Sequence, residues 1–453
     1  MFYSINPFSR EILGEFQAHS EKEMAGILET SQQAFNLWKK LRLSDRLGFL
    51  DRLADLLENR IEILAFSMSE EMGKTLTEAR AEVQKCAYGI RFFVEKSPLW
   101  LSEKKVQTDA RLSEIHYQPL GGILLVMPWN FPLWQVIRAG IPALCAGNVL
   151  VLKHAPNVFR FSGMIEALFQ EAGFPKGVFQ QIRVQPDALD PICGHPAIAA
   201  VSLTGSERAG RAMAAVAGKH LRKCVLELGG SDPFIVMPDA DLSFASDMAA
   251  RARLINNGQS CIAAKRFLIH QSVEKQFLDL FQARLAEFLP ANPCLPDTKL
   301  GPQAREDLSA ALEIQLERTL KAGAELVYRM EVPFGNGFFF LPALVKGVKP
   351  GMACFDEEVF GPIASVSSFE TTEECLLLAN QTRFGLGASI YTSDENTAMK
   401  MALALDCGTV AINAMVRSKP ALPFGGIKAS GFGREMSEIG LYEFTNPKSV
   451  SIG

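Results

Sequence analysis

Three side chains of this sequence together supply the groups needed for covalent chemistry on a carbonyl carbon. Cys261 ends the run NNGQSC at 256–261 and provides a thiol nucleophile. Glu227 ends an apolar segment, and a carboxylate with apolar neighbours serves as a base near neutral pH. The Asn130 amide and the Cys261 N–H could hold an oxyanion. Taken singly, each has a structural alternative, because a lone cysteine more often packs in a core.

Two further positions could bind a nucleotide. Lys153 ends an apolar segment, where its ammonium could reach ribose hydroxyls or a phosphate, although it could equally be a solvated strand end. The turn at 204–206, with Gly205 and Ser206, opens a predicted helix whose N-terminus could cradle a phosphate. Because the GxGxxG fingerprint is missing, a tight turn with a Ser206 N-cap is the alternative there.

Composition excludes several classes of protein. The 453 residues allow two or three domains, and 48% hydrophobic with 21% charged residues is typical of a globular protein. A net charge of −4 with mixed signs indicates neither nucleic acid nor a membrane surface as a partner. The N-terminus does not resemble a secretory signal, and no apolar run is long enough to span a bilayer. The cytoplasm is therefore the expected location.

Cysteine and histidine usage argues against disulfides and metals. The nine cysteines form no CxxC pair and are irregularly spaced, which is typical of a reducing compartment. The six histidines are dispersed and include no HExxH motif. We therefore expect no metal site.

The hydrophobic pattern predicts helices first and then alternating strands and helices. Helical spacing covers 21–40, 44–67 and 69–97, and a short hairpin at 103–118 is expected to leave the domain body. Predicted strands at 122–126, 149–153, 178–182, 198–203 and 223–227 alternate with helices at 131–146, 158–173 and 206–217. Repeated βαβ units predict a doubly wound parallel sheet, which binds ligands at the carboxyl ends of its strands. Asn130, Lys153, Gly205 and Glu227 all lie at or just after such ends.

A second α/β set is predicted from about residue 231 to 430. Its strands are expected near 233–237, 265–269, 363–368, 387–391 and 409–412, and its helices near 241–255, 271–288, 303–322 and 394–405. Proline and glycine at 333–337 predict a loop, and 448–452 predicts a last short strand. The expected fold class is α/β, with two doubly wound parallel-sheet domains and a small β arm.

Five motifs make the whole chain resemble the NAD(P)-dependent aldehyde dehydrogenase superfamily. They are PWNFP at 128–132, ELGG at 227–230, GQSC at 258–261, EEVFGP at 357–362 and PFGG at 423–426. The resemblance implies a dinucleotide-binding domain at 1–102 and 119–228, and a catalytic domain at 229–432. It also implies an oligomerisation arm, formed by 103–118 and 433–453, in a homodimer or homotetramer.

The resemblance also implies site roles. Cys261 is the nucleophile, Glu227 the base that activates the hydrolytic water, and Asn130 an oxyanion donor. Residues expected to bind the cofactor are Trp129, Lys153, Gly205, Ser206, Glu358 and Phe360. Relatives that transfer the acyl group to coenzyme A commonly lack the acid at Glu227, so its presence indicates hydrolysis.

The run KHAPN at 153–157 resembles compact bacterial succinate-semialdehyde dehydrogenases, in which an arginine placed like Arg138 binds the far carboxylate of the substrate. Trp134 and Ser418 would complete that pocket, whereas the alternative for Arg138 is an exposed helix residue. The second arginine and the redox-partner cysteine of some such enzymes are replaced here by Ile255 and Ala263. A broad-range enzyme for other ω-carboxy or medium-chain aldehydes and a non-catalytic relative are the rival interpretations.

Cofactor choice is predicted from one position. Many NAD-preferring members carry a glutamate three residues after the ribose lysine, and Pro156 occupies that place here. Without that acid a 2′-phosphate is repelled less, and Lys153 and His154 could favour it. We therefore expect NADP to be accepted, alongside NAD.

Overall fold

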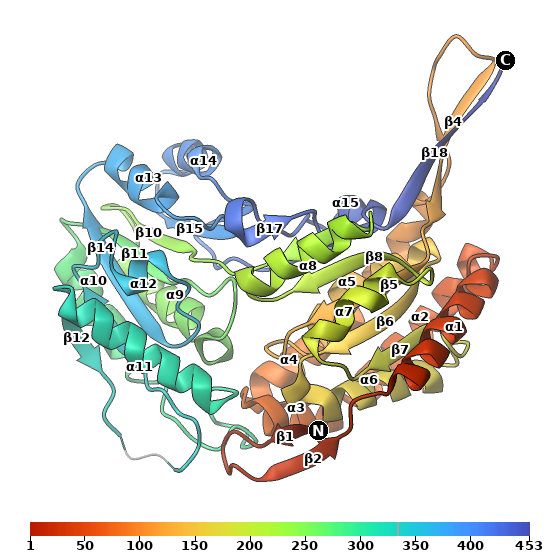
Figure 1. Cartoon of the computed structure of the whole chain (residues 1–453). Coiled ribbons are helices and arrows are strands. Elements are labelled where there is room, and N and C mark those ends of the chain that lie inside the picture. The colour runs from red at the N-terminus through yellow and green to blue at the C-terminus, as the bar shows by residue number, and fades with distance from the viewer. Residues whose placement is uncertain (333–334) are drawn as a thin grey trace.

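Two parallel-dominated sheets lie side by side in the computed structural model, which describes residues 1–332 and 335–453 (Figure 1). The predicted loop at 333–337 therefore falls partly outside the described residues. The first sheet has the order β17-β9-β8-β5-β6-β7 and is parallel except for the β17–β9 pair. Its strands are β5 (Gly122–Met127), β6 (Val149–His154), β7 (Phe179–Ile182), β8 (Ile198–Thr204), β9 (Lys223–Glu227) and β17 (Gly431–Phe432). The order places the ends of β5, β8 and β9 next to one another.

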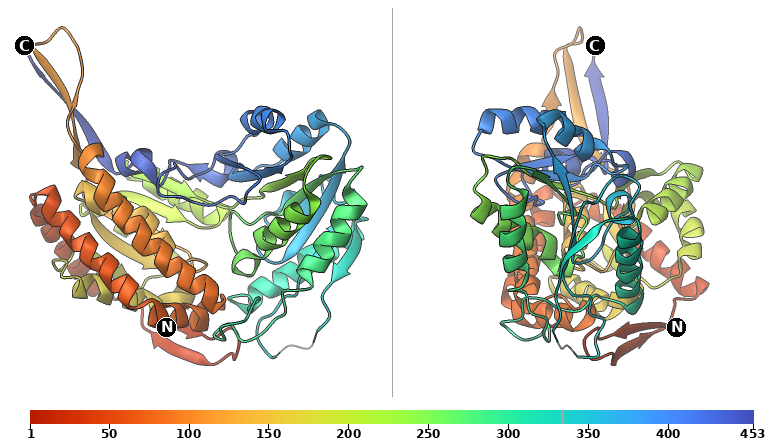
Figure 2. Two further views of the ribbon diagram at one scale, coloured as in Figure 1. Left: turned by 180° about the vertical axis from the view of Figure 1, so that it is seen from behind. Right: turned by 90° about the vertical axis from the view of Figure 1, so that its left-hand side faces the viewer.

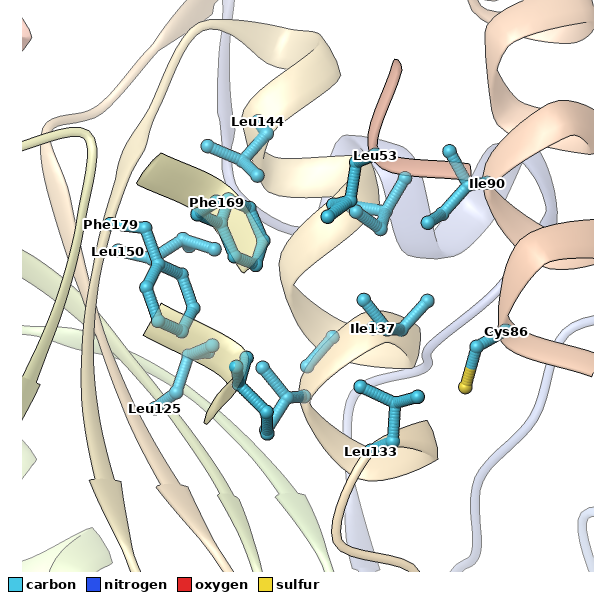
Figure 3. Close-up of a cluster of buried hydrophobic side chains, with 14 of the residues drawn as sticks. Leu53, Cys86, Ile90, Leu125, Leu133, Ile137, Leu144, Leu150, Phe169 and Phe179 are labelled. Carbon is cyan, nitrogen blue, oxygen red and sulfur yellow. The ribbon is translucent and has the colours of Figure 1, made fainter. Parts of the chain in front are cut away.

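Helices cover both faces of this sheet. They are α1 (Glu21–Trp38), α2 (Leu43–Asn59), α3 (Ile61–Met72), α4 (Leu76–Trp100), α5 (Trp134–Ala146), α6 (Phe159–Glu171), α7 (Leu189–Gly194) and α8 (Glu207–Lys219). Every residue of α5 is buried, because the helix lies between the sheet and helices α2 and α4. Figure 3 shows Ile137 and Leu144 of α5 with Leu150 and Phe169 on one side and Ile90 of α4 on the other. A side chain on α5 therefore points into the protein whichever way it faces.

The second sheet has the order β12-β13-β14-β11-β10-β15-β16, and only the β12–β13 pair is antiparallel. Its strands are β10 (Pro233–Val236), β11 (Arg266–His270), β12 (Glu325–Arg329), β13 (Ala343–Lys346), β14 (Ile363–Phe369), β15 (Gly387–Tyr391) and β16 (Thr409–Ile412). Around it lie α9 (Leu242–Leu254), α10 (Glu274–Leu285), α11 (Glu306–Lys321), α12 (Ala353–Asp356), α13 (Thr372–Asn380) and α14 (Glu395–Ala404). The α/β class and its parallel sheets are confirmed, although β12 and β13 were not predicted.

A three-stranded antiparallel ladder projects from the body (Figures 1 and 2). It consists of β3 (Lys104–Lys105), β4 (Leu112–Pro119) and β18 (Thr445–Ile452), which follows the short helix α15 (Ser437–Tyr442). β18 pairs with β4 along its whole length. An N-terminal hairpin of β1 (Phe2–Ile5) and β2 (Ile12–Phe16) was not predicted from the sequence.

The predicted helices at 44–67 and 69–97 differ from the observed ones. The first ends at Asn59, because Arg60 leaves helical geometry (φ −122°, ψ 21°) before α3 begins. α3 then ends at Gly73, whose left-handed φ of 83° makes it a helix C-cap. Thr75 starts α4 by accepting a hydrogen bond from the Glu78 N–H. These caps place α4 against α5, with Lys85 and Cys86 midway along it.

Candidate active site

Cys261 lies where two cavities meet. One, of about 360 Å³, is lined by Trp129, Asn130, Gly205, Ser206, Glu358 and Phe360, among others. The other, of about 380 Å³, is lined by Lys85, Trp134, Arg138, Ser418 and Phe424, among others. Cys261 and Gln135 line both cavities. The structure thus brings most of the predicted cofactor residues to one side of the thiol and all three predicted substrate residues to the other.

The backbone before Cys261 is unusual. Asn256, Asn257 and Gly258 adopt consecutive left-handed conformations, with φ of 53°, 57° and 78°. Asparagine tolerates this region better than most residues, and such conformations concentrate at functional sites. A Cβ on Gly258 would lie 2.5 Å from the carbonyl carbon of Gly361, so the loop and the EEVFGP segment approach closely only because Gly258 has no side chain.

Buried hydrogen bonds fix this loop from one side. The Asn257 side-chain amide donates to the carbonyl oxygens of Gly73 (2.9 Å) and Pro302 (3.0 Å). Its oxygen accepts the Gly301 N–H at 2.8 Å. Every polar atom of the Asn257 side chain is therefore paired, which offsets the unfavourable backbone conformation.

Lys265 holds the other side of the loop. Its ammonium donates to the carbonyl oxygens of Ser260 (3.0 Å), Cys261 (2.8 Å) and Ala263 (3.2 Å). Its nitrogen is also 3.8 Å from a Glu358 carboxylate oxygen. A buried cation that gathers three carbonyl groups fixes the backbone on which the Cys261 thiol is carried.

The surroundings of the Cys261 thiol favour its protonated form. Burial raises the pKa of Cys261 to about 12, although the positive charges of Arg138 and Lys265 act in the opposite direction. Attack on a carbonyl carbon therefore requires a base, or a further positive charge, that lowers the barrier to losing the thiol proton.

Glu227 is a buried carboxyl at the end of β9. It is 2% exposed, and burial together with the neighbouring Glu435 carboxylate raises its pKa well above the usual range. Neither carboxyl oxygen has a hydrogen-bond partner among the described residues. A Cβ on Gly425 would lie 2.5 Å from Glu227 Oε1, so this glycine makes room for the acid. Glu227 is not among the residues that line either cavity.

Two N–H donors border Cys261. Asn130 follows β5 and lines the 360 Å³ cavity, where its Nδ2 donates one hydrogen to the Gln259 carbonyl at 3.0 Å. An amide nitrogen carries two hydrogens, so the second is left for another acceptor. The Cys261 backbone N–H has no acceptor among the described residues. Both donors are therefore available to an oxygen on a carbon bonded to the thiol.

The 360 Å³ cavity has the features of a nucleotide site. The rings of Trp129 and Phe360 meet edge to face, with centroids 5.9 Å apart, and form an apolar wall. Gly205 leads into α8, and Ser206 caps that helix by accepting the Ala209 N–H at 3.3 Å. The N-terminus of α8 therefore faces a cavity in which it would stabilise an anion such as a phosphate.

Glu358 is positioned by two backbone groups. Its Oε1 accepts the Gly230 N–H at 3.0 Å, and any Cβ on Gly229 would clash with its carboxylate. Burial raises the pKa of Glu358, against the effect of Lys265. By contrast, Lys153 is buried at the end of β6 but is not among the residues lining either cavity. Burial lowers the pKa of Lys153, so an acceptor for its ammonium would be stabilising.

Arg138 is a buried residue rather than an exposed one. It is 2% exposed, because α5 is covered on all sides, and its guanidinium forms an ion pair with Glu435. The guanidinium also lies 4.7 Å from the centre of the Phe424 ring and donates to Thr204 Oγ1 at 3.3 Å. Arg138 therefore lines the 380 Å³ cavity with an internal carboxylate already bound.

Sequence reasoning missed four residues at the site: Lys85, Gln135, Lys265 and Glu435. Lys85 lies on a helix that its periodicity assigned to the scaffold, and Lys265 directly precedes a strand. Glu435 forms an ion pair with Arg138, which lies 297 positions away (435 − 138) in the chain. No local sequence pattern predicts such a pair. Only Gln135 had a signal, since it stands beside Trp134 in the predicted helix.

Comparison with known proteins agrees with this geometry. The family model described as the aldehyde dehydrogenase family matches residues 1–450. A probable succinate-semialdehyde dehydrogenase (NADP(+)) of Synechocystis sp. is 43% identical over 449 residues, which are 99% of both chains. The succinate semialdehyde dehydrogenase (NAD(P)+) of Escherichia coli is 42% identical over 99% of this chain and 97% of its own.

A solved structure of a related enzyme has the same fold as this chain. The succinic semialdehyde dehydrogenase from Streptococcus pyogenes, in complex with NADP+, superposes with a TM-score of 0.98 at 34% identity, covering 100% of both chains. The family model alone spans nearly the whole chain, and these relatives exceed the identity at which a shared fold is secure. The chain belongs to the aldehyde dehydrogenase family.

Proposed function

We propose that this protein oxidises succinate semialdehyde to succinate with NAD(P)+, through a covalent intermediate on Cys261. The observation that carries the proposal is the position of Cys261 between two cavities, one suited to a nucleotide and the other lined by Arg138 and Lys85. This second cavity also contains Glu78 and Glu82, but its cationic side chains can bind the carboxylate of an ω-carboxy aldehyde. The names of the relatives support the same substrate.

The chain's own residues account for the chemistry. Cys261 Sγ adds to the aldehyde carbon, and its proton is released to solvent. The Asn130 amide and the Cys261 N–H hold the oxyanion of the thiohemiacetal. The bound dinucleotide supplies the acceptor for the hydride that leaves when this oxyanion collapses to a thioester. Glu227 then takes a proton from water as the water attacks the acyl carbon, which releases succinate and the thiol.

We propose that NADP+ is accepted alongside NAD+. Pro156 begins the short 3₁₀ helix after β6, where many relatives that prefer NAD carry a glutamate. Lys153, buried beside it with a pKa lowered by burial, is the cation expected to approach the adenosine ribose. Names of the relatives include both NADP(+) and NAD(P)+.

A purified-enzyme assay tests the function directly. Succinate semialdehyde, butanal and a longer ω-carboxy aldehyde are each offered with NADP+ or NAD+, and formation of the reduced nicotinamide is followed. The proposal predicts the highest kcat/KM for succinate semialdehyde and no activity in Cys261→Ala. Equal kcat/KM for all aldehydes would indicate a broad-range enzyme instead, and activity in Cys261→Ala would contradict the mechanism.

We also propose the assembly, domains and location expected from the sequence. The projecting ladder of β3, β4 and β18 supports a homodimer or homotetramer, and the two sheets support the dinucleotide-binding and catalytic domains. All nine cysteines are free, as a cytoplasmic location requires. Among the described helices, none combines the length and apolar character needed to cross a bilayer.

A further inference from the structure

We propose that Lys85 is a substrate-binding residue whose ammonium, together with the Ser418 hydroxyl, holds the far carboxylate of the aldehyde. This inference deepens the proposed function and rests on it. Lys85 lies on α4, lines the same 380 Å³ cavity as Cys261, and is half-buried. The thiol and the ammonium thus border one space, in which an aldehyde group can face Cys261 while a carboxylate faces Lys85.

The packing of α4 directs Lys85 into this cavity. The next residue, Cys86, points into the apolar core towards Leu133, which precedes α5, and Ile137 of α5 (Figure 3). Successive helix residues are about 100° apart around the axis, so Lys85 emerges beside this core at the edge of α5. There its ammonium lies 4.1 Å from the centre of the Trp134 ring. Lys85 is therefore held over an aromatic surface in the cavity rather than extended into solvent.

Gly89, one turn further along α4, seats the Trp134 ring. A Cβ on Gly89 would lie 3.1 Å from Trp134 Cζ3, which is tighter than ordinary packing. The absence of a side chain at Gly89 lets the indole approach α4 closely, beside Lys85. The position of the ammonium is thus fixed by the backbone of one helix and a buried ring of another.

Lys85 has no ion-pair partner among the described residues, although Glu82, which lines the same cavity, acts on its charge from a greater distance. The other buried cations nearby have carboxylate partners, since Arg138 pairs with Glu435 and Lys74 pairs with Glu82. Among the described residues, no carboxylate oxygen lies within 4.0 Å of Lys85 Nζ. Burial, followed by the positive charge of Arg138, lowers the pKa of Lys85 to about 8. An anionic ligand would therefore relieve an unfavourable charge at this position.

Ser418 completes the site because its hydroxyl hydrogen remains available for a hydrogen bond. Its oxygen is 2.7 Å from Lys85 Nζ and 3.1 Å from Trp134 Nε1. Both neighbours can only donate, so the Ser418 oxygen accepts from each and its own proton is left over. With no acceptor for that proton among the described residues, the hydroxyl is free to donate to a carboxylate bound at Lys85. The site thus offers a cation and a neutral donor to one anionic group.

Arg138 and Lys85 then have different tasks. Arg138 and Glu435 form a buried pair whose charges cancel, and the guanidinium shapes the cavity next to Phe424. Lys85 supplies the positive charge that distinguishes a carboxylate from a methyl group at the same distance from Cys261. Preference for an ω-carboxy aldehyde should therefore depend on Lys85.

Substitution of Lys85 tests the assignment. We compare Lys85→Met with wild type, using kcat/KM for succinate semialdehyde divided by kcat/KM for butanal. This ratio should fall about tenfold or more, the effect of losing one charge-assisted hydrogen bond. Lys85→Arg should recover most of the ratio. Lys96→Met, which changes the other lysine of α4 where it pairs with Glu95 on the surface, is the matched control and should leave the ratio unchanged.

A binding measurement separates recognition from folding. Succinate should inhibit the wild type competitively with the aldehyde, and its inhibition constant should rise about tenfold in Lys85→Met. If Lys85→Met does not fold, Lys85→Gln, which keeps a donor near Ser418, gives the same two readouts. A ratio and an inhibition constant that both change less than about twofold would overturn the assignment.

The same data distinguish the two proposals. A wild-type enzyme that shows no preference for succinate semialdehyde over butanal contradicts the proposed function, and with it the role of Lys85. A wild-type preference that Lys85→Met retains contradicts the role of Lys85 alone. A preference lost in Lys85→Met and recovered in Lys85→Arg supports both.

Discussion

At the scale of single residues, the two central groups of the site share one physical condition. Cys261 and Glu227 are both desolvated, and burial raises the pKa of each. The protonated forms of the thiol and of the carboxyl group are therefore favoured, which avoids an unpaired buried charge at rest. Reactivity then depends on a ligand that closes the cavity and on the Asn130 and Cys261 N–H donors, which stabilise charge only once an oxyanion forms.

Replacing Glu227 by Gln should separate the two halves of the reaction. Without the carboxylate, water attacks the thioester slowly, so steady-state turnover should fall about 100-fold or more. A first turnover should persist as a burst of reduced nicotinamide that approaches one per active site, because thiol attack does not use Glu227. Rapid-mixing kinetics measure both phases. Steady-state turnover within about twofold of wild type would contradict the role of Glu227.

Removing the Arg138 side chain should affect stability as well as substrate binding. Arg138→Ala leaves Glu435 buried without its partner, and breaking such a pair typically costs about 3–5 kcal/mol. Adding Glu435→Gln should recover much of this loss, because the remaining charge is removed. Denaturant unfolding of the single and double variants gives the free energies, and equal stability of the two would contradict the pairing.

Substrate affinity should weaken above neutral pH as Lys85 loses its charge. Burial and then Arg138 lower the pKa of Lys85 to about 8, and only the protonated form, present below that pKa, binds a carboxylate. The other groups around the ammonium are Glu82, Cys86, Arg138 and Arg417. The inhibition constant of succinate should therefore rise above about pH 8, and this rise should disappear in Lys85→Met. An inhibition constant of succinate that does not change up to pH 9.5, roughly 1.5 units beyond that pKa, would contradict binding of the carboxylate by charged Lys85.

At the scale of elements, the loop before Cys261 is the part most dependent on a single residue type. Gly258→Ala introduces a Cβ 2.5 Å from the Gly361 carbonyl carbon at a φ of 78°. We expect loss of more than about 1 kcal/mol of stability and a larger loss of activity, because Cys261 moves with the loop. Gly26→Ala is the control, since no heavy atom lies within 4 Å of its Cβ on α1. That variant should be unchanged or more stable by thermal unfolding.

Elements with a strong local signal could be predicted from the sequence. The strands around 122–126, 149–153 and 223–227 have apolar centres, and Asn130 and Glu227 lie at or just after strand ends in the structure as expected. The helix boundaries at Arg60 and Gly73 were missed because the apolar spacing continues across them, although Gly73 is a local helix-ending signal. The weakly apolar strand β12 was missed because its place in the sheet depends on pairing with β13. The Arg138–Glu435 pair and the Lys85–Ser418 contact were missed for the same reason.

At the scale of the whole molecule, the projecting ladder is the feature least explained by a single chain. Most residues of β18 are exposed, and the ladder extends far from either sheet (Figure 2). Long exposed strands are usually covered in native proteins. We propose that a second copy of the chain packs against this ladder. Deleting residues 446–453 should convert the oligomer into monomers in light-scattering chromatography. A full-length chain that is already monomeric would contradict this proposal.

The central claim is that Cys261, among nine cysteines, carries the acyl group between the two cavities. Its most direct test is peptide mass spectrometry of Glu227→Gln after mixing with succinate semialdehyde and NADP+ and rapid acid quenching. We expect one succinyl group, attached as a thioester to the peptide that contains Cys261 and absent when Cys261→Ala is added. A succinyl group on any other cysteine, or none while reduced nicotinamide forms, would contradict it.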